Sequence, residues 1–379
     1  MFELSREFRL IEHKVCYTIA NLDSMIFDEQ LDYIEVSSKP ENNGPLVSRM
    51  LKALVIGQQR DIPVIFNRNA QVFDSDNLPK KFEVGLFTSG TTGAPKLIFH
   101  SIGSLLPKNS KSHSEQTRWL LCYHPMSFAG LQVILQTVVS GDTLVSNVDA
   151  NIKQKAKLAS DYMINAISAT PSMFRAMLLA WGDSLPNFKL ISLGGEIATQ
   201  SILDDIKKFF PKVALRHIYA TTEAGVVFTV KDGLAGFPKS WLNQYLNGWQ
   251  LKATHTLILN KEGLQLDTGD SIIERGDRIL FNGRLDNLIN VGGVKVNLEI
   301  LEQKIIALEH IIDARVFAKA NPITGALVCV ELCAKDPQLA RAELDTFSYQ
   351  LEPAAKPRII IFSEQITLTD AGKKQRTIK

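Results

Sequence analysis

Runs of apolar residues alternate along the chain with segments of helical spacing. Apolar residues at helical spacing predict a helix over residues 45–56, which Pro45 would begin and Gly57 would end. A β-branched run follows at residues 62–66, and residues 82–88 alternate before a loop rich in glycine and threonine. Four further strand-like runs are 144–148, 164–170, 188–195 and 213–220. Strands that alternate with helices predict an α/β layered fold.

The pattern changes near residue 285. Beyond this point, Asn297 is the predicted N-cap of an amphipathic helix. The buried stripe of this helix is predicted to be Leu298, Leu301, Ile305 and Leu308. Strands are expected at 314–319, 326–334 and 358–362, with a hairpin at 321–325 and a polar C-terminal tail. We therefore expect a large α/β domain over residues 1–284 and a small, mobile α+β domain over residues 286–379.

Composition narrows the class of protein. The 379 residues are enough for two or three domains, and 45% of them are hydrophobic, which is typical of globular proteins. Lys and Arg number 42 against 40 Asp and Glu, a formal net charge of +2. Such a balance gives no sign of a nucleic-acid-binding protein or of a polybasic membrane binder, so neither partner is expected.

Cysteines and apolar stretches indicate a reduced, soluble protein. Four cysteines are too few for a disulfide scaffold in a chain of this length. Cys329 and Cys333 fall on one face of a predicted strand without nearby metal-ligand partners, so we expect them in the core. The N-terminus lacks the apolar region of a signal peptide, and residues 120–139 contain too many polar residues for a membrane span. A cytoplasmic location is expected.

A loop at residues 88–96, TSGTTGAPK, is the strongest single signal. Its glycines free the backbone to wrap around a ligand, and its hydroxyl groups and Lys96 can donate to phosphate oxygens. It is not a Walker A sequence, because Pro95 stands where the second glycine would be. A plain polar turn between strands is the alternative.

Five further short motifs follow this loop. They are LGGE at 193–196, YATTE at 219–223, TGD at 268–270, GRLD at 283–286 with its continuation to Glu302, and TDAGKKQR at 369–376. Any one of them could occur by chance, but six in this order are specific. The set resembles the adenylate-forming superfamily, which includes acyl- and aryl-CoA ligases, non-ribosomal peptide adenylation domains and luciferases. The resemblance implies that superfamily's fold, with a shortened N-terminal domain.

The resemblance also implies a reaction. A carboxylic acid attacks the α-phosphate of ATP to give an acyl-adenylate and pyrophosphate, and the acyl group then passes to a thiol. ATP, Mg²⁺ and CoA are the implied co-substrates and cofactors. Lys373 would reach the α-phosphate and the carboxylate, Thr222 would donate to the α-phosphate, and Glu223 would hold Mg²⁺. Read without the other motifs, Lys373 is better explained as part of a solvated basic tail.

The resemblance assigns a larger set of residues to ATP. Residues 89–96 would bind the leaving pyrophosphate, Asp270 the ribose hydroxyls with Arg284 nearby, and Tyr219 would lie near the base or the acyl pocket unless it is a core tyrosine. The glycine pair would bring the backbone close to the adenine. The complete set is Thr88, Ser89, Gly90, Thr91, Thr92, Gly93, Lys96, Gly194, Gly195, Glu196, Tyr219, Asp270 and Arg284.

Residues near the predicted boundary would serve the second half-reaction. Asp286 would be the hinge about which the small domain rotates. Gly292 and Gly293 would face the CoA tunnel, and Lys295 would contact a CoA phosphate. A plain tight turn is the alternative for the two glycines.

Two stretches are similar to the short o-succinylbenzoate–CoA ligases of menaquinone biosynthesis: FAGLQV at 128–133 and DNLINVGGVK at 286–295. The expected acid pocket is Ser127, Phe128, Gly130 and Ala220. Ala220 replaces a glycine of the superfamily's motif, and the expected histidine before this segment is Met126 or Ser127, with His124 close by. Three readings stay open: a ligase for o-succinylbenzoate or a related aromatic acid, an enzyme that loads an acid onto a carrier-protein thiol or an amine, and a non-catalytic nucleotide- or acid-binding remnant.

Overall fold

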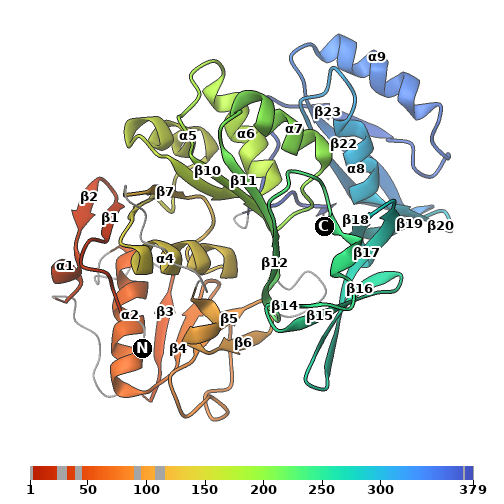
Figure 1. The fold of residues 1–379 in the computed structure, drawn as a ribbon. Coiled ribbons are helices and arrows are strands. Elements are labelled where there is room, and N and C mark those ends of the chain that lie inside the picture. The colour runs from red at the N-terminus through yellow and green to blue at the C-terminus, as the bar shows by residue number, and fades with distance from the viewer. Residues whose placement is uncertain are drawn as a thin grey trace.

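An eight-stranded sheet forms the centre of the largest part of the chain (Figure 1). The computed structural model describes residues 3–23, 32–38, 45–88, 95–106, 116–369 and 372–378. The sheet has the order β12-β11-β10-β9-β7-β8-β1-β2, and only its two edge pairs are antiparallel. Its strands are β1 (Arg9–Glu12), β2 (Val15–Tyr17), β7 (Arg118–Leu121), β8 (Thr143–Ser146), β9 (Ala166–Ala169), β10 (Leu190–Gly194), β11 (Ala214–Thr221) and β12 (Gly225–Val230).

Four helices connect the parallel strands. They are α4 (Phe128–Ser140), α5 (Ile152–Asp161), α6 (Pro171–Trp181) and α7 (Gln200–Phe209). The chain steps in one direction along the sheet from β7 to β8 and in the other from β8 onwards. Because such crossovers are right-handed, α4 lies on one face and the other three helices on the opposite face, as Figure 1 shows. The predicted strand-like runs at 144–148, 164–170, 188–195 and 213–220 overlap β8, β9, β10 and β11 of this sheet. The predicted α/β class is confirmed.

A four-stranded sheet of order β3-β4-β5-β6 lies beside α2 (Leu46–Arg60). Its strands are β3 (Ile34–Ser37), β4 (Val64–Asn67), β5 (Val84–Phe87) and β6 (Leu97–His100); the short helices α1 (Ile19–Asp23) and α3 (Ile102–Leu105) flank this region in sequence. The predicted helix ends were wrong: Pro45 is the N-cap, and the helix continues through Gly57 to Arg60. A Cβ at Gly57 would lie 2.3 Å from Val64 Cγ2, so this glycine allows helix and strand to approach closely.

A six-stranded antiparallel sheet of order β13-β18-β17-β16-β15-β14 has its own apolar core. Its strands are β13 (Phe237–Pro238), β14 (Tyr245–Leu246), β15 (Trp249–Ala253), β16 (Thr256–Lys261), β17 (Leu264–Arg275) and β18 (Arg278–Arg284), with the 3₁₀ helices η1 (Lys239–Trp241) and η2 (Leu285–Asn287). Figure 1 shows this sheet between the eight-stranded sheet and the last part of the chain.

Residues 288–378 form what we call the C-terminal unit, which also has its own core. It contains β19 (Leu288–Val291), β20 (Val294–Asn297), α8 (Leu298–Ile306), β21 (Asp313–Asn321), β22 (Gly325–Cys333), α9 (Pro337–Ser348), β23 (Ile359–Phe362) and β24 (Thr377–Ile378). Its main sheet has the order β23-β22-β21-β24. The polar tail thus ends in a strand beside β21. The domain boundaries at 284 and 286 stay predictions.

The helix predictions for the C-terminal unit are confirmed in part. Asn297 is the N-cap of α8, where its Oδ1 accepts from the amides of Glu299 and Ile300 at 3.0 and 3.1 Å. Leu308 lies beyond the end of this helix. Helix α9 was not predicted, although Asp336 caps it and Pro337 begins it.

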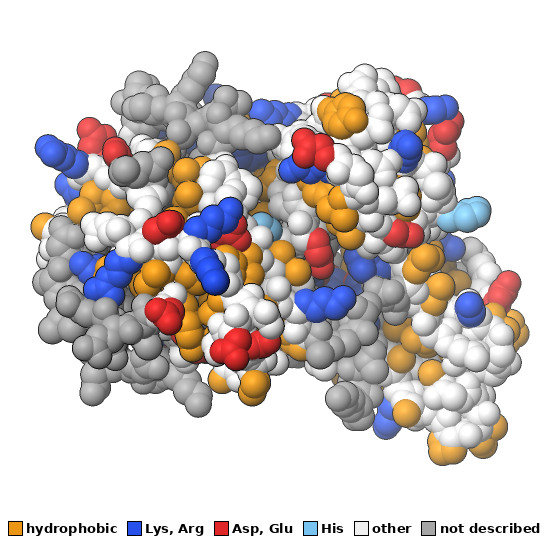
Figure 2. All heavy atoms as spheres, turned by 90° about the horizontal axis from the view of Figure 1, so that it is seen from below, with side chains coloured by type: hydrophobic (Ala, Val, Ile, Leu, Met, Phe, Trp, Pro, Cys, Tyr) orange, Lys and Arg blue, Asp and Glu red, His pale blue; other side chains and the backbone are white. Residues whose placement is uncertain are grey.

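The predicted core assignments hold. Cys329 and Cys333 are free and buried in β22, and residues 120–139 form the end of β7, a connecting loop and most of α4. Across the described ranges, no helix has the length and apolar character needed to cross a membrane. Figure 2 shows charged side chains of both signs interspersed on one face of the molecule.

Gly57→Ala is expected to lower the free energy of unfolding by about 1–3 kcal/mol, because the new methyl group overpacks against Val64. Gly103→Ala is the matched control, since a Cβ at that helical glycine meets nothing within 4 Å. Urea unfolding of both variants measures the difference. A Gly57→Ala variant as stable as the wild type would contradict the packing argument.

Candidate active site

A cavity of about 640 Å³ opens at the carboxyl ends of β10 and β11. Parallel strands bring their carboxyl ends to one edge of a sheet, where the following loops can surround a ligand. Segments that are far apart in the sequence meet here. The predicted residues that line the cavity are Thr88, Lys96, Gly195, Glu196, Tyr219, Ala220, Thr222, Glu223, Asp270, Arg284 and Lys373.

Asp270 on β17 is held from both sides. The hydroxyl of Tyr219 donates to Oδ2 at 2.5 Å, and Nη1 of Arg284 donates to Oδ1 at 2.9 Å. Burial raises the pKa of Asp270 above its usual value, although the hydrogen bonds and the charge of Arg284 oppose the shift. The register of β17 and β18 sets this geometry, because it pairs Asp270 directly with Arg284.

Tyr219 presents its hydroxyl, rather than a ring face, to the cavity. The rings of Phe228 and Phe281 stack against its ring, with centroids 5.1 and 4.9 Å away and interplanar angles of 17° and 14°. Burial, followed by the charge of Asp270, raises the pKa of this phenol well above its usual value. The tyrosine is therefore a fixed hydrogen-bond donor to the carboxylate.

Thr222 and Glu223 lie in the turn between β11 and β12. The hydroxyl of Thr221 accepts from the amide of Ala224 at 2.9 Å and closes this turn. Behind it, His100 lies near the backbone of Thr222 and the charge of Glu223. Burial lowers the pKa of His100, so the imidazole stays neutral near pH 7. The turn thus places a hydroxyl and a carboxylate at the cavity wall.

The glycine pair at the end of β10 lies beside Lys373. Gly195 has a φ of 80°, and a Cβ there would lie 3.6 Å from Cε of Lys373. The carboxylate of Glu196 accepts from the amide of Ser172 at 3.0 Å. Gly194 lies at the end of β10, where its carbonyl accepts from the hydroxyl of Tyr123 at 3.3 Å. Gly195 is therefore the glycine of the pair that lies next to Lys373.

Lys373 reaches the cavity from the C-terminal unit. Its carbonyl accepts from the amide of Thr369 at 2.7 Å, and its own amide donates to the hydroxyl of Thr369 at 3.2 Å. An antiparallel bridge between Leu368 and Lys374 lies next to these bonds. The side chain of Lys373 lines the same wall as Glu196 and Thr222.

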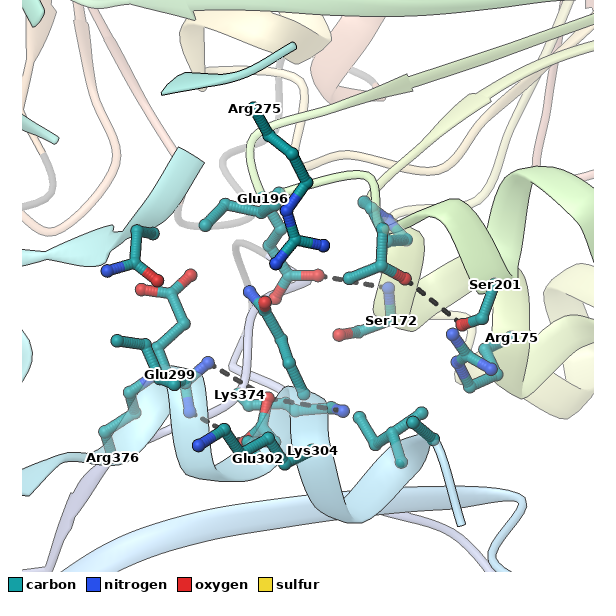
Figure 3. A pocket seen from close by; sticks show the side chains of 18 residues that line it. Ser172, Arg175, Glu196, Ser201, Arg275, Glu299, Glu302, Lys304, Lys374 and Arg376 are labelled. Atoms are coloured by element: carbon teal, nitrogen blue, oxygen red, sulfur yellow. Dashed lines mark hydrogen bonds and ion pairs between the residues drawn. The ribbon is translucent and has the colours of Figure 1, made fainter. Parts of the chain in front are cut away.

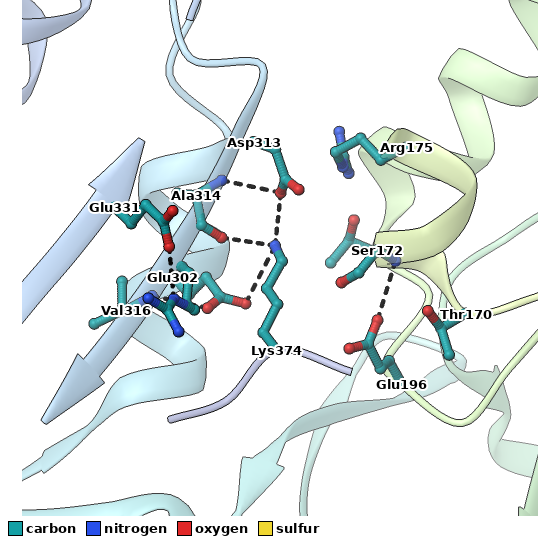
Figure 4. Close-up of polar contacts among 12 residues, drawn as sticks. Thr170, Ser172, Arg175, Glu196, Glu302, Asp313, Ala314, Val316, Glu331 and Lys374 are labelled. Atoms are coloured by element: carbon teal, nitrogen blue, oxygen red, sulfur yellow. Dashed lines mark hydrogen bonds and ion pairs between the residues drawn. The ribbon is translucent and has the colours of Figure 1, made fainter. Parts of the chain in front are cut away.

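The adjacent Lys374 points the other way, into the C-terminal unit (Figure 4). Its Nζ donates to Oδ1 of Asp313 and to the carbonyl of Ala314, both at 2.6 Å, and lies 3.6 Å from Glu302. Arg376 donates to both oxygens of Glu302 at 2.7 and 3.0 Å. The side chains of Lys374, Asp313 and Glu302 are all at most 6% exposed.

This buried network has a pH dependence. Burial alone would raise the pKa of Glu302, but the charges of Lys374 and Arg376 outweigh it and hold the pKa below its usual value. Ionised Glu302 therefore stabilises the fold above its unfolded pKa of about 4.3, and this stability is lost as the pH falls below that value.

A second cavity of about 430 Å³ lies between α6 and α8 (Figure 3). Its walls carry charges of both signs, and it shares Glu196 and Glu299 with the first cavity. Burial raises the pKa of Glu299, whose Oε2 accepts from the backbone amide of Arg284 at 3.2 Å and from the side chain of Asn287 at 2.9 Å. The interface between the C-terminal unit and the rest of the chain is thus polar and incompletely filled.

Other predicted residues lie away from the cavity lining. Ser127 is the N-cap of α4, where its hydroxyl accepts from the amide of Gly130 at 3.0 Å and donates to the carbonyl of His124 at 2.7 Å. A Cβ at Gly130 would lie 2.1 Å from that carbonyl oxygen, so this glycine is required by packing. Phe128 contacts the ring of His100, with their centroids 5.6 Å apart. Of the predicted acid pocket, only Ala220 lines the cavity.

The residues predicted to bind CoA form the turn between β19 and β20. Gly292 and Gly293 have φ values of 59° and 90°, and the amide of Gly293 donates to Oδ1 of Asn290 at 2.8 Å. Lys295 is exposed on β20. Asp286 lies in η2. The predicted phosphate-loop residues Ser89, Gly90, Thr91, Thr92 and Gly93 lie outside the described residues.

Sequence reasoning missed several residues of the cavity wall. Phe281 and His217 come from strands, and Glu299 comes from the first turn of α8. The strand-like run at 213–220 and the capping signal at Asn297 predicted a strand and a helix near two of these residues, but neither carried a sign of the cavity. Burial lowers the pKa of His217, whose Nε2 lies 3.0 Å from the carbonyl oxygen of Leu234.

A layered α/β domain with this cavity at its strand ends, and a lysine supplied by a smaller C-terminal unit, is the arrangement that the resemblance to adenylate-forming ligases implies. The sequence model of the AMP-binding enzyme family matches residues 24–271, and the chain belongs to this family. It is an enzyme of the adenylate-forming ligase class.

The chain is also similar in sequence to curated relatives and similar in fold to solved structures. The D-alanine–D-alanyl carrier protein ligase of Staphylococcus haemolyticus (strain JCSC1435) is 26% identical over 355 residues, which cover 81% of this chain and 73% of the relative. The fold is similar to that of a single-residue variant of E. coli MenE with bound OSB-AMS, with a TM-score of 0.64, 15% identity and coverage of 87% and 83% of the two chains. ATP-bound MatB from Rhodopseudomonas palustris has a TM-score of 0.68, 12% identity and coverage of 98% and 95%.

Lys374→Met is expected to lower the free energy of unfolding by about 3–5 kcal/mol, because it leaves the buried Asp313 without its cation and leaves the buried Glu302 with Arg376 alone. The matched control is Lys335→Met, which changes an exposed lysine of the same unit. Urea unfolding near pH 7 measures both. A loss below about 1 kcal/mol for Lys374→Met would show that the network does not hold the C-terminal unit together.

Proposed function

We propose that the chain is an AMP-forming acid–thiol ligase. A carboxylate oxygen of the acid attacks the α-phosphorus of ATP and pyrophosphate leaves; a thiol sulfur then attacks the acyl carbon and AMP leaves. The observation that carries this proposal is the convergence of Lys96, Thr222, Glu223, Asp270 and Lys373 on one cavity. These residues come from distant parts of the sequence, so their meeting is not a by-product of local structure.

Each group suits one part of an ATP–acid complex. Lys373 is a point charge that can neutralise charge developing on the α-phosphate and carboxylate oxygens. Thr222 can donate to the same phosphate. Asp270, already oriented by Tyr219 and Arg284, can accept from ribose hydroxyl groups.

The described residues also fit Mg²⁺. This ion keeps most of its water and phosphate ligands and needs only one or two protein carboxylates. Glu223 lines the cavity near Thr222 and supplies such a carboxylate. When bound, Mg²⁺ would offset charge on the phosphates and fix their geometry.

An aromatic acid is our first candidate substrate, with CoA as the thiol. Residues 128–133 and 286–295 resemble those of o-succinylbenzoate–CoA ligases. The fold is also similar to that of the B. subtilis o-succinylbenzoate CoA synthetase in complex with OSB-AMP, at a TM-score of 0.63. On this proposal, Asp286 is the hinge, and Gly292, Gly293 and Lys295 serve CoA.

A carrier-protein thiol is the second candidate acceptor. It is favoured by the similarity in sequence to D-alanine–D-alanyl carrier protein ligases, at 26% identity. The two candidates share the adenylation step and differ in acid and acceptor. A non-catalytic remnant is disfavoured, because such a protein would not need to keep Lys373, Thr222 and Glu223 at the cavity.

Lys373→Ala is expected to reduce acid-dependent exchange of labelled pyrophosphate into ATP by at least about 100-fold, because the charge beside the α-phosphate is lost. Lys335→Ala, an exposed lysine of the same unit, should exchange like the wild type. The assay is run over a panel of aromatic, succinyl-aryl and fatty acids and D-alanine. Exchange by the Lys373→Ala variant at the wild-type rate would overturn the catalytic assignment of Lys373.

The acceptor is tested with the acid that gives the fastest exchange. We expect CoA to release AMP and form a thioester faster than a pantetheinylated carrier protein does. Mass spectrometry of both products measures the two rates. Preferential loading of the carrier protein would reject CoA as the acceptor and leave the adenylation step intact.

A further inference from the structure

Thr170, which no sequence motif marks, touches the segment that carries Lys373. This threonine caps α6, where its hydroxyl oxygen accepts from the amide of Met173 at 3.0 Å. The same hydroxyl donates to the carbonyl oxygen of Gly372 at 2.6 Å. Thr170 is 0% exposed, so this bond is shielded from water.

Gly372 fits this contact only without a side chain. Its φ is 73°, and a Cβ would lie 2.4 Å from the sulfur of Met173. Backbone and helix end therefore meet at close range. Thr170 also flanks the active cavity, because its methyl carbon and Cε of Lys373 each lie 3.6 Å from the position of a Cβ on Gly195.

The other end of this segment is fixed to the C-terminal unit. Lys374 reaches Asp313 and Ala314 (Figure 4). On the other side of Lys373, Gly372 accepts from Thr170. Lys373 thus lies between one anchor in its own unit and one anchor in the larger part of the chain. The first anchor travels with the C-terminal unit, whereas the second exists only while the two parts are docked.

We propose that Thr170 is a positioning residue for adenylation, whose hydrogen bond to Gly372 holds Lys373 in the cavity. The inference rests on the proposed function of Lys373. Thr170 is absent from the residues that line the cavity, so it acts through Lys373 rather than on substrate. Its loss should lower the fraction of molecules with Lys373 in place and leave the binding of ATP and acid nearly unchanged.

Thr170→Val keeps the shape of the side chain and removes the donor. We expect kcat for pyrophosphate exchange to fall roughly 3- to 10-fold, as for the loss of one buried hydrogen bond, with KM for ATP and acid within about twofold of the wild type. Thr170→Ser keeps both hydrogen bonds and should restore kcat. The Asn151→Ala variant, which loses the N-cap of α5, controls for a lost cap and should keep wild-type exchange.

Hydrogen–deuterium exchange without substrates tests the contact independently of turnover. Peptides that contain residues 372–376 should exchange faster in Thr170→Val than in the wild type and in Thr170→Ser. Equal exchange in all three proteins would overturn the inference. So would a kcat for Thr170→Val equal to that of the wild type. Failure of wild-type protein to activate any acid would instead reject the proposed function, and the deuterium result would still decide whether Thr170 holds the segment.

Discussion

The parallel pairing of β9, β10 and β11 is the constraint on which the site depends. It brings Thr170, Gly195 and the Thr222–Glu223 turn to one edge of the sheet, because each comes directly after the carboxyl end of one of these strands. The β17–β18 register then sets Asp270 opposite Arg284 at the same cavity. Residues that are far apart in the sequence therefore meet at this edge and line one cavity.

Docking of the C-terminal unit completes the cavity. The Lys373 segment meets the larger part of the chain through one short hydrogen bond at Gly372, and through polar groups around a partly open interface. Its own unit holds it far more firmly, through the buried carboxylates that surround Lys374. On the proposed function, one strong and one weak attachment would allow Lys373 to be present for adenylation and absent for the next step.

Capping residues predicted helix ends, and the order of the motifs along the chain predicted residues that line the cavity. Asn297 could be recognised as a cap because its partners lie within three residues. Asp270 was expected at the site because TGD and GRLD follow one another in the superfamily's order, and it lines the cavity. Gly57 was misread because its reason is contact with Val64 in a neighbouring strand. The contact between Thr170 and Gly372 gave no signal because the two residues lie 202 positions apart. Ser127 was expected in the acid pocket, and its hydrogen bonds are those of a helix cap.

The central claim is that a carboxylate attacks the α-phosphate of ATP in this cavity. The direct measurement uses an acid that supports pyrophosphate exchange, labelled with ¹⁸O in its carboxylate, together with ATP and the thiol acceptor. Mass spectrometry of the nucleotide product should find one carboxylate oxygen transferred to AMP, because the acyl carbon leaves that oxygen behind on phosphorus. Unlabelled AMP, or label that appears in inorganic phosphate, would contradict the account.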